Sequence, residues 1–234
     1  MCGRYALLDL AEFIGLFPWV APPELFAPRY NIAPSQPILM LSNRNGGKLE
    51  HAIWGLVPAW AKQTEEVKSM INARAETVAS RPMFRGSLRH KRCVVPASGF
   101  YEWQRTGGGK QPFYITLPTK RPMLFAGLWE DTPDRGGGEI RTACIITTAA
   151  NEFMQSVHDR MPAILSPEQA TTWIRTPDTE AEGLTGLLRP YAGTMQKVAV
   201  SRVVNSPAND RAECIAPFAE EPPQGKKQEP GLFG

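Results

Sequence analysis

The residue with the most distinctive chemistry in this sequence is the cysteine at position two. An initiator methionine is commonly removed when the second residue is small, and Cys2 is small enough. Loss of Met1 would leave a free α-amine and a thiol on one residue, a 1,2-aminothiol. Since an α-amino group has a reference pKa of roughly 7.7–8.0, part of it is neutral and nucleophilic near pH 7, whereas a lysine at roughly 10.4 would need strong desolvation.

Two reactions are open to such a terminus. In one, the thiolate attacks a carbonyl while the α-amine acts as the base, the arrangement of N-terminal nucleophile hydrolases. In the other, the amine condenses with an aldehyde to an imine, and the thiol then closes a five-membered thiazolidine ring. The alternative to both is a buried, unreactive thiol, as most free cysteines are. Position alone does not separate these three.

The composition excludes several other classes of protein. Hydrophobic residues make up 42% of the 234 residues, which rules out wholesale disorder, and no apolar run approaches the roughly 18–20 residues that span a bilayer. The four cysteines are scattered without metal-ligand spacing, and with three histidines the sequence predicts neither a metal site nor a cofactor. We therefore expect a reduced, soluble protein without a membrane partner, cytoplasmic in a bacterium or nuclear in a eukaryote.

The elements that would position Cys2 are short and separated by prolines and glycines. Hydrophobic alternation and turn residues predict strands over 2–8, 38–42, 49–56, 92–96, 100–105, 113–117, 123–130, 140–147 and 197–203. Helical spacing and capping residues predict helices over 10–17, 81–90, 149–156, 167–174 and 179–189, with 18–36 mostly loop. The pattern indicates an α+β fold: one domain over 1–217 on an antiparallel or mixed β-sheet with a barrel-like core and short flanking helices, followed by a flexible tail over 218–234.

Seven segments, in order along the chain, resemble one known family. They are Met1-Cys2-Gly3-Arg4-Tyr5, Tyr30–Pro34, Trp54–Trp60 (WGLVPAW), Ile71–Thr77 (INARAET), Cys93–Trp103 with its Gly-Phe-Tyr-Glu-Trp ending, Thr147–Ala150, and His158-Asp159-Arg160-Met161-Pro162. Each segment alone is common, but together they resemble the SOS-response-associated peptidase family, whose members crosslink to abasic sites in single-stranded DNA. The similarity runs from residue 2 to about Pro217.

The resemblance implies a role for four residues. Cys2 is then the nucleophile, exposed once the protein's own peptidase-like action removes Met1, and it forms a thiazolidine with C1′ of the ring-opened sugar. Asn72, Glu102 and His158 match the other active-site positions. A carboxylate such as Glu102 suits deprotonation of the α-ammonium, and an imidazole suits proton donation to the sugar ring oxygen. Imine formation also permits β-elimination, so a lyase activity is expected beside the crosslink.

The resemblance also implies DNA contacts. Arg4, Arg74 and Arg160 each lie within two residues of a proposed active-site position, and guanidinium groups bind phosphate bidentately. Trp60 matches an aromatic that packs on the bases beside the lesion, although Ala61 replaces the second aromatic of some relatives. Arg81 and Arg85 belong to a run of basic residues over 81–92 that would add salt-dependent affinity. The simpler alternatives are surface solvation and internal ion pairs with Glu76 or Asp159. Trp54 and Trp103 are predicted to be core residues.

Two other functions remain open from the sequence. Glutamine amidohydrolases of one class also begin Met-Cys-Gly, so Cys2 could serve such an enzyme, although this chain has no room for the synthase domain that usually accompanies it. In a non-enzymatic module, Cys2 would be structural and the basic segments would tether partners. The tail contains Gln228…Leu232-Phe233, a loose match to sliding-clamp-binding peptides that would add replication-fork proteins to the expected partners.

Overall fold

A closed ring of strands forms the centre of the fold. The computed structural model describes residues 2–60, 69–107, 109–118, 121–133 and 137–218. Within them, five strands pair in a circle: β10 (Glu139–Ala149), β4 (Leu49–Trp54), β3 (Pro37–Ser42), β6 (Arg92–Ala97) and β9 (Met123–Pro133), with β9 paired back to β10. The β4–β10 pair is parallel and the others are antiparallel. This ring confirms the predicted α+β fold with a mixed, barrel-like core.

Three short strands extend the edges of the ring. β5 (Asn72–Arg74) runs parallel to β10, and β11 (Arg160–Pro162) pairs with the end of β10 in the antiparallel direction. β12 (Ile164–Leu165) pairs with β9. Because β5 and β11 both bind β10, residues far apart in the sequence come together along that strand.

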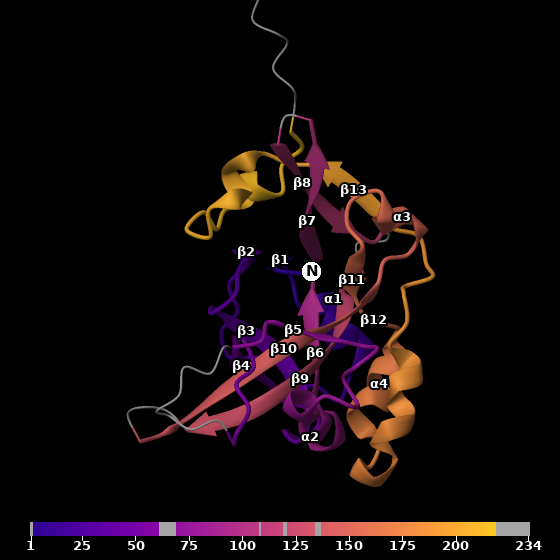
Figure 1. The fold of residues 1–234 in the computed structure, drawn as a ribbon. Helices are drawn as coiled ribbons and strands as arrows, with labels where there is room; N and C mark the ends of the chain where they lie inside the picture. Colours follow the sequence, from indigo (N-terminus) through magenta and orange to yellow (C-terminus); the bar gives the residue numbers. More distant parts are fainter. Residues whose placement is uncertain (1, 61–68, 108, 119–120, 134–136, 219–234) are drawn as a thin grey trace, which may run out of the picture.

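A second sheet packs over the open side of the ring. Its order is β13 (Gln196–Ala199), β8 (Gly109–Thr116), β7 (Gly99–Thr106), β1 (Tyr5–Leu7) and β2 (Arg29–Ile32). Figure 1 shows β7 and β8 rising above the ring, with β1 of the same sheet near the centre of the view. The residues just before β1 therefore lie inside the molecule, where the two sheets meet.

The aromatic ring of Tyr5 on β1 joins the two sheets. Tyr5 meets Trp54 of β4 edge-on at 5.4 Å between ring centroids, and Phe125 of β9 at 6.1 Å. Such edge-to-face pairs add about 0.5–1.5 kcal/mol each beyond the area they bury. The opposite face of the second sheet carries Tyr101 and Tyr114, which pack with the C-terminal segment in a separate cluster. Around β1 and the first half of β7, the second sheet is thus buried on both faces.

The start of β7 depends on a glycine. A Cβ atom at Gly99 would lie 2.6 Å from the carbonyl oxygen of Ile115 and 2.7 Å from the ring of Tyr114. Real Cβ atoms do not come this close, so a larger side chain would push β7 away from β8. Gly99 therefore sets the position of the strand that carries Glu102.

The helices lie outside the ring, and a buried arginine ties two of them to it. α2 (Pro82–His90) begins with proline at its first turn, and α4 (Pro167–Arg175) begins with a capping box between Ser166 and Gln169. The fully buried Arg92 donates hydrogen bonds to carbonyl oxygens at the C-terminal ends of both, including those of Leu88 and Thr176. The remaining helices are α1 (Ala11–Leu16), α3 (Glu152–Gln155) and the 3₁₀ helices η1 (Asp178–Leu187), η2 (Arg202–Asn205) and η3 (Ala212–Cys214).

Several predicted boundaries differ from the observed ones. The loop predicted over 18–36 contains β2. The sequence does not predict β5, β11 and β12, because each has at most three residues and no alternating pattern. The helix predicted over 179–189 is a 3₁₀ helix, and the strand predicted over 197–203 ends at Ala199. The strands predicted on either side of three glycine-containing turns are confirmed, and they pair as the antiparallel hairpins β3–β4, β7–β8 and β9–β10. The predicted tail lies almost wholly outside the described residues, so the boundary at 217 stays a prediction.

Candidate functional site

Cys2 lies at the junction of the two sheets, completely buried. It precedes β1, which pairs with β7 through Tyr5 and Phe100, and the carbonyl oxygen of Arg4 accepts a hydrogen bond from the N–H of Tyr101. The β1–β7 pairing places Cys2 beside Glu102. Burial raises the pKa of the Cys2 thiol well above its ordinary value, and the nearby charge of Glu102 raises it further. In this arrangement the thiol is protonated.

Asn72, on β5 at the edge of the ring, contacts the backbone of Cys2. Its strand, β5, pairs with β10 through Ile145, and its side-chain Nδ2 donates a 2.8 Å hydrogen bond to the carbonyl oxygen of Cys2. The Asn72 Oδ1 atom is buried without a hydrogen-bond partner among the described residues. A buried amide oxygen without a donor is costly, by about 1–3 kcal/mol, so this atom is a ready acceptor for a ligand or a terminal N–H group.

Glu102 is a buried carboxyl group next to the same terminus. Only 4% of the residue is exposed, and burial raises its pKa to about 7, with a contribution from the negative charge of Asp159. A hydrogen bond with the backbone of Trp103 acts in the opposite direction. A carboxyl group with a pKa near 7 can both take up and release a proton at neutral pH, which is what a general base and acid needs.

His158 lies in the loop between α3 and β11. Its Nδ1 atom accepts a 3.0 Å hydrogen bond from the N–H of Arg160 and lies 2.7 Å from Oδ1 of Asp159. The two contacts suit different protonation states, since neutral imidazole accepts from Arg160 and imidazolium donates to Asp159. Burial lowers the pKa of His158, the charge of Asp159 opposes this, and the charge of Arg160 adds to it. The carboxylate of Asp159 would therefore stabilise a transient imidazolium.

The predicted phosphate contact Arg160 is engaged within the protein. Its guanidinium binds Glu76 bidentately, with Nη1–Oε1 at 2.7 Å and Nη2–Oε2 at 3.0 Å, and Nη2 also donates to the carbonyl oxygen of Thr147 at 2.6 Å. The Arg160 side chain is 14% exposed and that of Glu76 is 50% exposed, and the contact lowers the pKa of Glu76. The ion pair with Glu76 that the sequence offered as the simpler alternative is thus present.

Arg4 is also held internally. Its Nη1 donates to Oδ1 of Asn31 at 2.8 Å and to the carbonyl oxygen of Val204 at 2.7 Å, and its guanidinium lies 5.7 Å from the ring centroid of Trp103. These contacts tie β1 to β2, β7 and η2. Arg4 therefore has a structural role in this arrangement, and its contact with DNA stays a prediction.

The other predicted DNA contacts are on the surface. Arg74 at the end of β5, Arg81 at the start of α2 and Arg85 within α2 are exposed. Trp60 is 63% exposed. Trp54 is fully buried as predicted, whereas Trp103 is half-buried, with its Nε1 donating to Oδ1 of Asn205 at 2.8 Å.

Sequence reasoning missed a hollow beside His158. It has a volume of about 510 Å³ and is lined by residues 103–105 of β7 and by residues 155–159. The lining residues come from segments that are about fifty positions apart, so no spacing rule could have found them. The polar residues Gln104, Arg105 and Thr106 at the end of β7 are the sequence signal that this strand continues to the surface.

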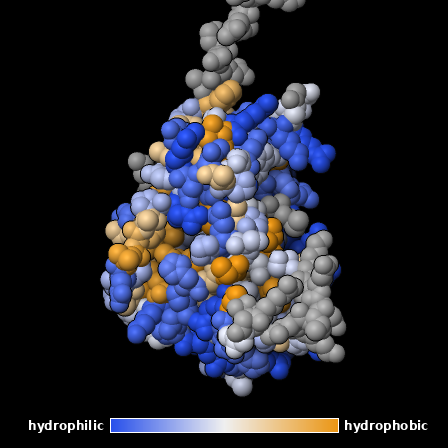
Figure 2. Space-filling view, turned by 90° about the vertical axis from the view of Figure 1, so that its left-hand side faces the viewer, coloured by the Kyte–Doolittle hydropathy of each residue, from blue (hydrophilic) through white to orange (hydrophobic). Residues whose placement is uncertain are grey.

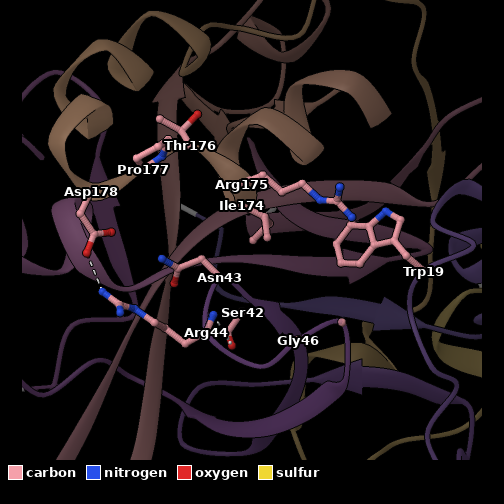
Figure 3. A pocket seen from close by; sticks show the side chains of 11 residues that line it. Trp19, Ser42, Asn43, Arg44, Gly46, Ile174, Arg175, Thr176, Pro177 and Asp178 are labelled. Atoms are coloured by element: carbon pink, nitrogen blue, oxygen red, sulfur yellow. Dashed lines mark hydrogen bonds and ion pairs between the residues drawn. The ribbon is translucent and has the colours of Figure 1, made fainter.

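Other cavities among the described residues lie away from Cys2, one of them, of about 450 Å³, between α2 and η1 beside Arg85. A pocket of about 710 Å³ opens between the β3–β4 turn and the end of α4, where the guanidinium of Arg175 stacks on Trp19 at 4.4 Å and Arg44 pairs with Asp178 (Figure 3). A smaller one of about 210 Å³ lies among β2, β3 and β4 beside the 88% exposed Leu25. Figure 2, which shows one face of the molecule, has apolar residues in several separate patches among charged ones. None of the four candidate active-site residues lines any of these cavities.

The described residues contain no cluster of three or more histidine, cysteine, aspartate or glutamate side chains able to hold a metal ion. In the same residues, no helix has the length and apolar character that crossing a bilayer requires. The four cysteines are free thiols, all buried.

Comparisons with known proteins agree on one family. The model of the family described as SOS response associated peptidase (SRAP) matches residues 1–207. Abasic site processing protein YoqW of Bacillus subtilis is 42% identical over 225 residues, covering 92% of this chain and 99% of that protein. Abasic site processing protein YedK of Escherichia coli is 35% identical (93% of this chain, 100% of that protein), and abasic site processing protein HMCES of Gallus gallus is also 35% identical (82% and 67%).

Solved structures share the fold. A protein from Bacteroides thetaiotaomicron superposes with a TM-score of 0.81 at 24% identity, covering 93% of this chain and all of that one. A phage-related protein from Bordetella bronchiseptica superposes with a TM-score of 0.65 at 29% identity (84% of this chain, 94% of that one).

Proposed function

This chain belongs to the SOS response associated peptidase family, and from that premise we propose that it is an abasic site processing protein that traps the aldehyde of a ring-opened abasic sugar in single-stranded DNA at Cys2. The observation that carries the proposal is the meeting of three groups: the terminal cysteine, an amide hydrogen-bonded to its carbonyl at 2.8 Å, and a buried carboxyl group with a pKa of about 7. The names of the relatives support the substrate.

The reaction first requires a free terminal amine. Hydrolysis of the Met1–Cys2 peptide bond consumes one water and releases methionine, which turns the amide nitrogen of Cys2 into an amine. We assign this step to the protein itself, with Glu102 as the general base. Glu102 is suited to it because its proton affinity is matched to neutral pH.

The amine then attacks C1′ of the aldehyde. The carbinolamine loses water to give an imine, with His158 supplying the proton that the departing hydroxyl needs and Glu102 removing the proton from the attacking nitrogen. The Cys2 S–H adds across the C=N bond, so sulfur bonds C1′ and nitrogen keeps one hydrogen. The sum is aldehyde plus aminothiol giving thiazolidine plus water. Asn72 holds the carbonyl of Cys2 throughout, which fixes the direction of the terminus.

A lyase activity follows from the same intermediate. The imine makes the C2′ hydrogens acidic, and loss of one of them expels the 3′ phosphate by β-elimination. Ring closure by the thiol removes the imine and therefore protects the strand. The crosslink is expected to dominate while Cys2 is intact, with strand incision as the minor outcome.

The strand is held by stacking and by charge. Trp60 offers an exposed ring to a base, and such stacking tolerates any sequence. Arg74 at the end of β5, Arg81 just before α2 and Arg85 within α2 are exposed cations. Arg4 and Arg160 would reach phosphate by exchanging internal partners for it.

The test is direct. Protein whose Met1 has been removed, verified by intact mass, is mixed with a single-stranded oligonucleotide that carries one abasic site. We expect an adduct on a denaturing gel without borohydride, and none with Cys2→Ala or Cys2→Ser. Glutamine hydrolysis that needs Cys2 and ignores DNA would point to an amidohydrolase, and Met1 retained in protein from cells would point to a non-enzymatic module.

A further inference from the structure

The pocket between the β3–β4 turn and the end of α4 has no part in the proposed function. Its volume of about 710 Å³ falls in the range of roughly 300–1,000 Å³ that is usual for ligand sites. Figure 1 places α2 and α4 on one side of the chain start and β7 and β8 on the other. Because none of the candidate active-site residues lines this pocket, a molecule bound in it leaves Cys2 free.

One wall of the pocket is Trp19, which is fixed on two sides. Its ring meets that of Phe17 edge-on, at 5.9 Å between the centroids. The β3–β4 turn packs so closely that a Cβ atom at Gly47 would lie 2.5 Å from the carbonyl oxygen of Trp19 and 3.1 Å from its ring. The N–H of Ala21 also donates to the carbonyl oxygen of Gly47 at 2.9 Å. A wall held in this way loses little conformational entropy when a ligand binds.

The guanidinium of Arg175 covers this wall. It lies 4.4 Å from the centroid of the Trp19 ring, and Figure 3 shows the two side chains together at one end of the pocket. Arg175 is exposed, and no carboxylate among the described residues pairs with it. The simpler role is that of a cation at a helix C-terminus, but the buried Arg92 already donates to the carbonyl oxygens of Trp173 and Thr176 there. Arg175 is therefore available to an anionic group.

Asp178 stands at the other end of the pocket with one oxygen engaged. Its Oδ2 atom accepts a hydrogen bond from Nη2 of Arg44 at 2.6 Å and lies 2.9 Å from Nδ1 of His90. Its Oδ1 atom lies 3.9 Å from Nη1 of Arg92, which is beyond hydrogen-bond distance. Oδ1 can therefore accept a hydrogen bond from a ligand N–H group.

These groups together match an acidic peptide. Arg175 suits a carboxylate, Asp178 suits a backbone N–H, and the buried Ile174 offers an apolar surface to a neighbouring side chain. In the view of Figure 3, Asn43 and Ile174 lie between Asp178 and Trp19. A doubly charged phosphate fits less well, because the carboxylate of Asp178 would repel it. Arginine and tryptophan are also the residue types that most often dominate the energy of protein interfaces.

We propose that this pocket is a docking site for an acidic, extended segment of a partner protein. A carboxylate of the segment binds Arg175 where it covers Trp19, and a backbone N–H of the segment donates to Oδ1 of Asp178. The inference goes beyond the proposed function and does not depend on it. Since the pocket is separate from Cys2, the protein can hold DNA and the partner at the same time.

The test uses peptides as probes. Fluorescent octapeptides with blocked ends, one central glutamate and varied neighbours are titrated into the full-length protein, and binding is followed by anisotropy. We expect at least one of them to bind with a Kd below about 1 mM. Replacing its glutamate by glutamine, or Arg175→Ala in the protein, should each weaken that binding roughly tenfold. Arg105→Ala removes an exposed arginine from the end of β7 and should leave it unchanged. Thermal unfolding shows that both variants are folded.

A charge exchange separates a direct contact from a structural role. Arg175→Glu should lose the acidic peptide and gain its counterpart with lysine in place of glutamate. The inference is overturned if no peptide binds below about 1 mM, if Arg175→Ala binds as tightly as the wild-type protein, or if single-stranded DNA displaces the peptide. A protein that binds the peptide but forms no adduct with an abasic oligonucleotide would contradict the proposed function alone.

Discussion

The side-chain Nδ2 of Asn72 lies 2.8 Å from the carbonyl oxygen of Cys2, so β5, at the edge of the closed ring, holds the backbone of Cys2 while β7 presents Glu102 beside it. The two residues are seventy positions apart. Parallel pairing of β5 with β10 brings them together, and the hydrogen bond fixes where the amine of Cys2 must point once it is free.

The first prediction concerns this hydrogen bond. Asn72→Ala should slow adduct formation by roughly 10- to 100-fold, because loss of one positioning contact in a preorganised site commonly costs about 1.5–3 kcal/mol. Single-turnover kinetics on an abasic oligonucleotide measure it. Asn45→Ala, which removes an exposed amide bonded within the β3–β4 turn, is the matched control and should react at the wild-type rate. A wild-type rate for Asn72→Ala would remove this residue from the mechanism.

The second prediction is a pH dependence of rate. Burial holds the pKa of Glu102 at about 7, and the ionised form is the base. The rate of adduct formation should therefore rise through pH 7 and level off above about pH 8. In Glu102→Gln the rate should be low, and the step at pH 7 should vanish. A step near pH 7 that survives in the Gln variant would belong to another group, with the α-amine as the first candidate.

The same carboxyl group predicts a pH dependence of stability. Its folded pKa lies above the unfolded value of roughly 4.3, so the folded state binds more protons between the two values, and the free energy of unfolding falls as pH rises from about 4.5 through 7. The loss attributable to Glu102 should be about 3 kcal/mol. Urea unfolding at pH 5 and pH 8 tests this. The free energy of unfolding should differ between the two pH values by about 3 kcal/mol less in Glu102→Gln than in the wild-type protein.

The third prediction concerns the ion pair between Glu76 and Arg160. The carboxylate of Glu76 occupies both guanidinium positions that a phosphate would use, so a strand must compete with it. Glu76→Gln should strengthen binding of single-stranded DNA about three- to tenfold. Anisotropy titrations on Arg160→Ala and on the double variant complete the cycle, in which the gain from Glu76→Gln should disappear once Arg160 is absent. A gain that persists without Arg160 would mean that Glu76 simply repels the strand.

The fourth prediction concerns Trp60. Because it is 63% exposed, Trp60→Ala should change the free energy of unfolding by less than about 0.5 kcal/mol, yet it should weaken binding of single-stranded DNA by about 1–3 kcal/mol. Leu25→Ala removes an even more exposed apolar side chain elsewhere and should leave DNA affinity unchanged. Wild-type affinity of Trp60→Ala for single-stranded DNA would contradict a role of Trp60 in DNA binding.

The hairpins could be predicted from the sequence because their signals are local. Glycine turns separate β7 from β8, and Ser166-Pro167 marks the start of α4, so neighbouring residues alone define them. β5 could not be predicted in this way. Three residues carry no periodicity, and β5 is a strand only because β10 offers it a free edge.

In the candidate site, too, some features follow from the local sequence and others depend on the fold. Cys2 could be singled out from its position, since terminal chemistry needs no knowledge of the fold. The distance from Asn72 to Cys2 could not be predicted, because it depends on the parallel pairing of β5 with β10. The internal partners of Arg4 and Arg160 could not be predicted either. The local sequence around an arginine is the same whether its side chain binds a phosphate or a carboxylate such as that of Glu76.

The central claim is that nitrogen and sulfur of Cys2 together bind one sugar carbon, and peptide mass spectrometry tests it most directly. The adduct is formed with an abasic oligonucleotide, digested with nuclease and trypsin, and treated with iodoacetamide before analysis. The account predicts that the peptide Cys2–Arg4 carries the sugar minus one water, lacks Met1, and takes up no alkyl group. A sugar bound to a lysine, or an adducted peptide that still begins with Met1 or still alkylates at sulfur, would contradict it.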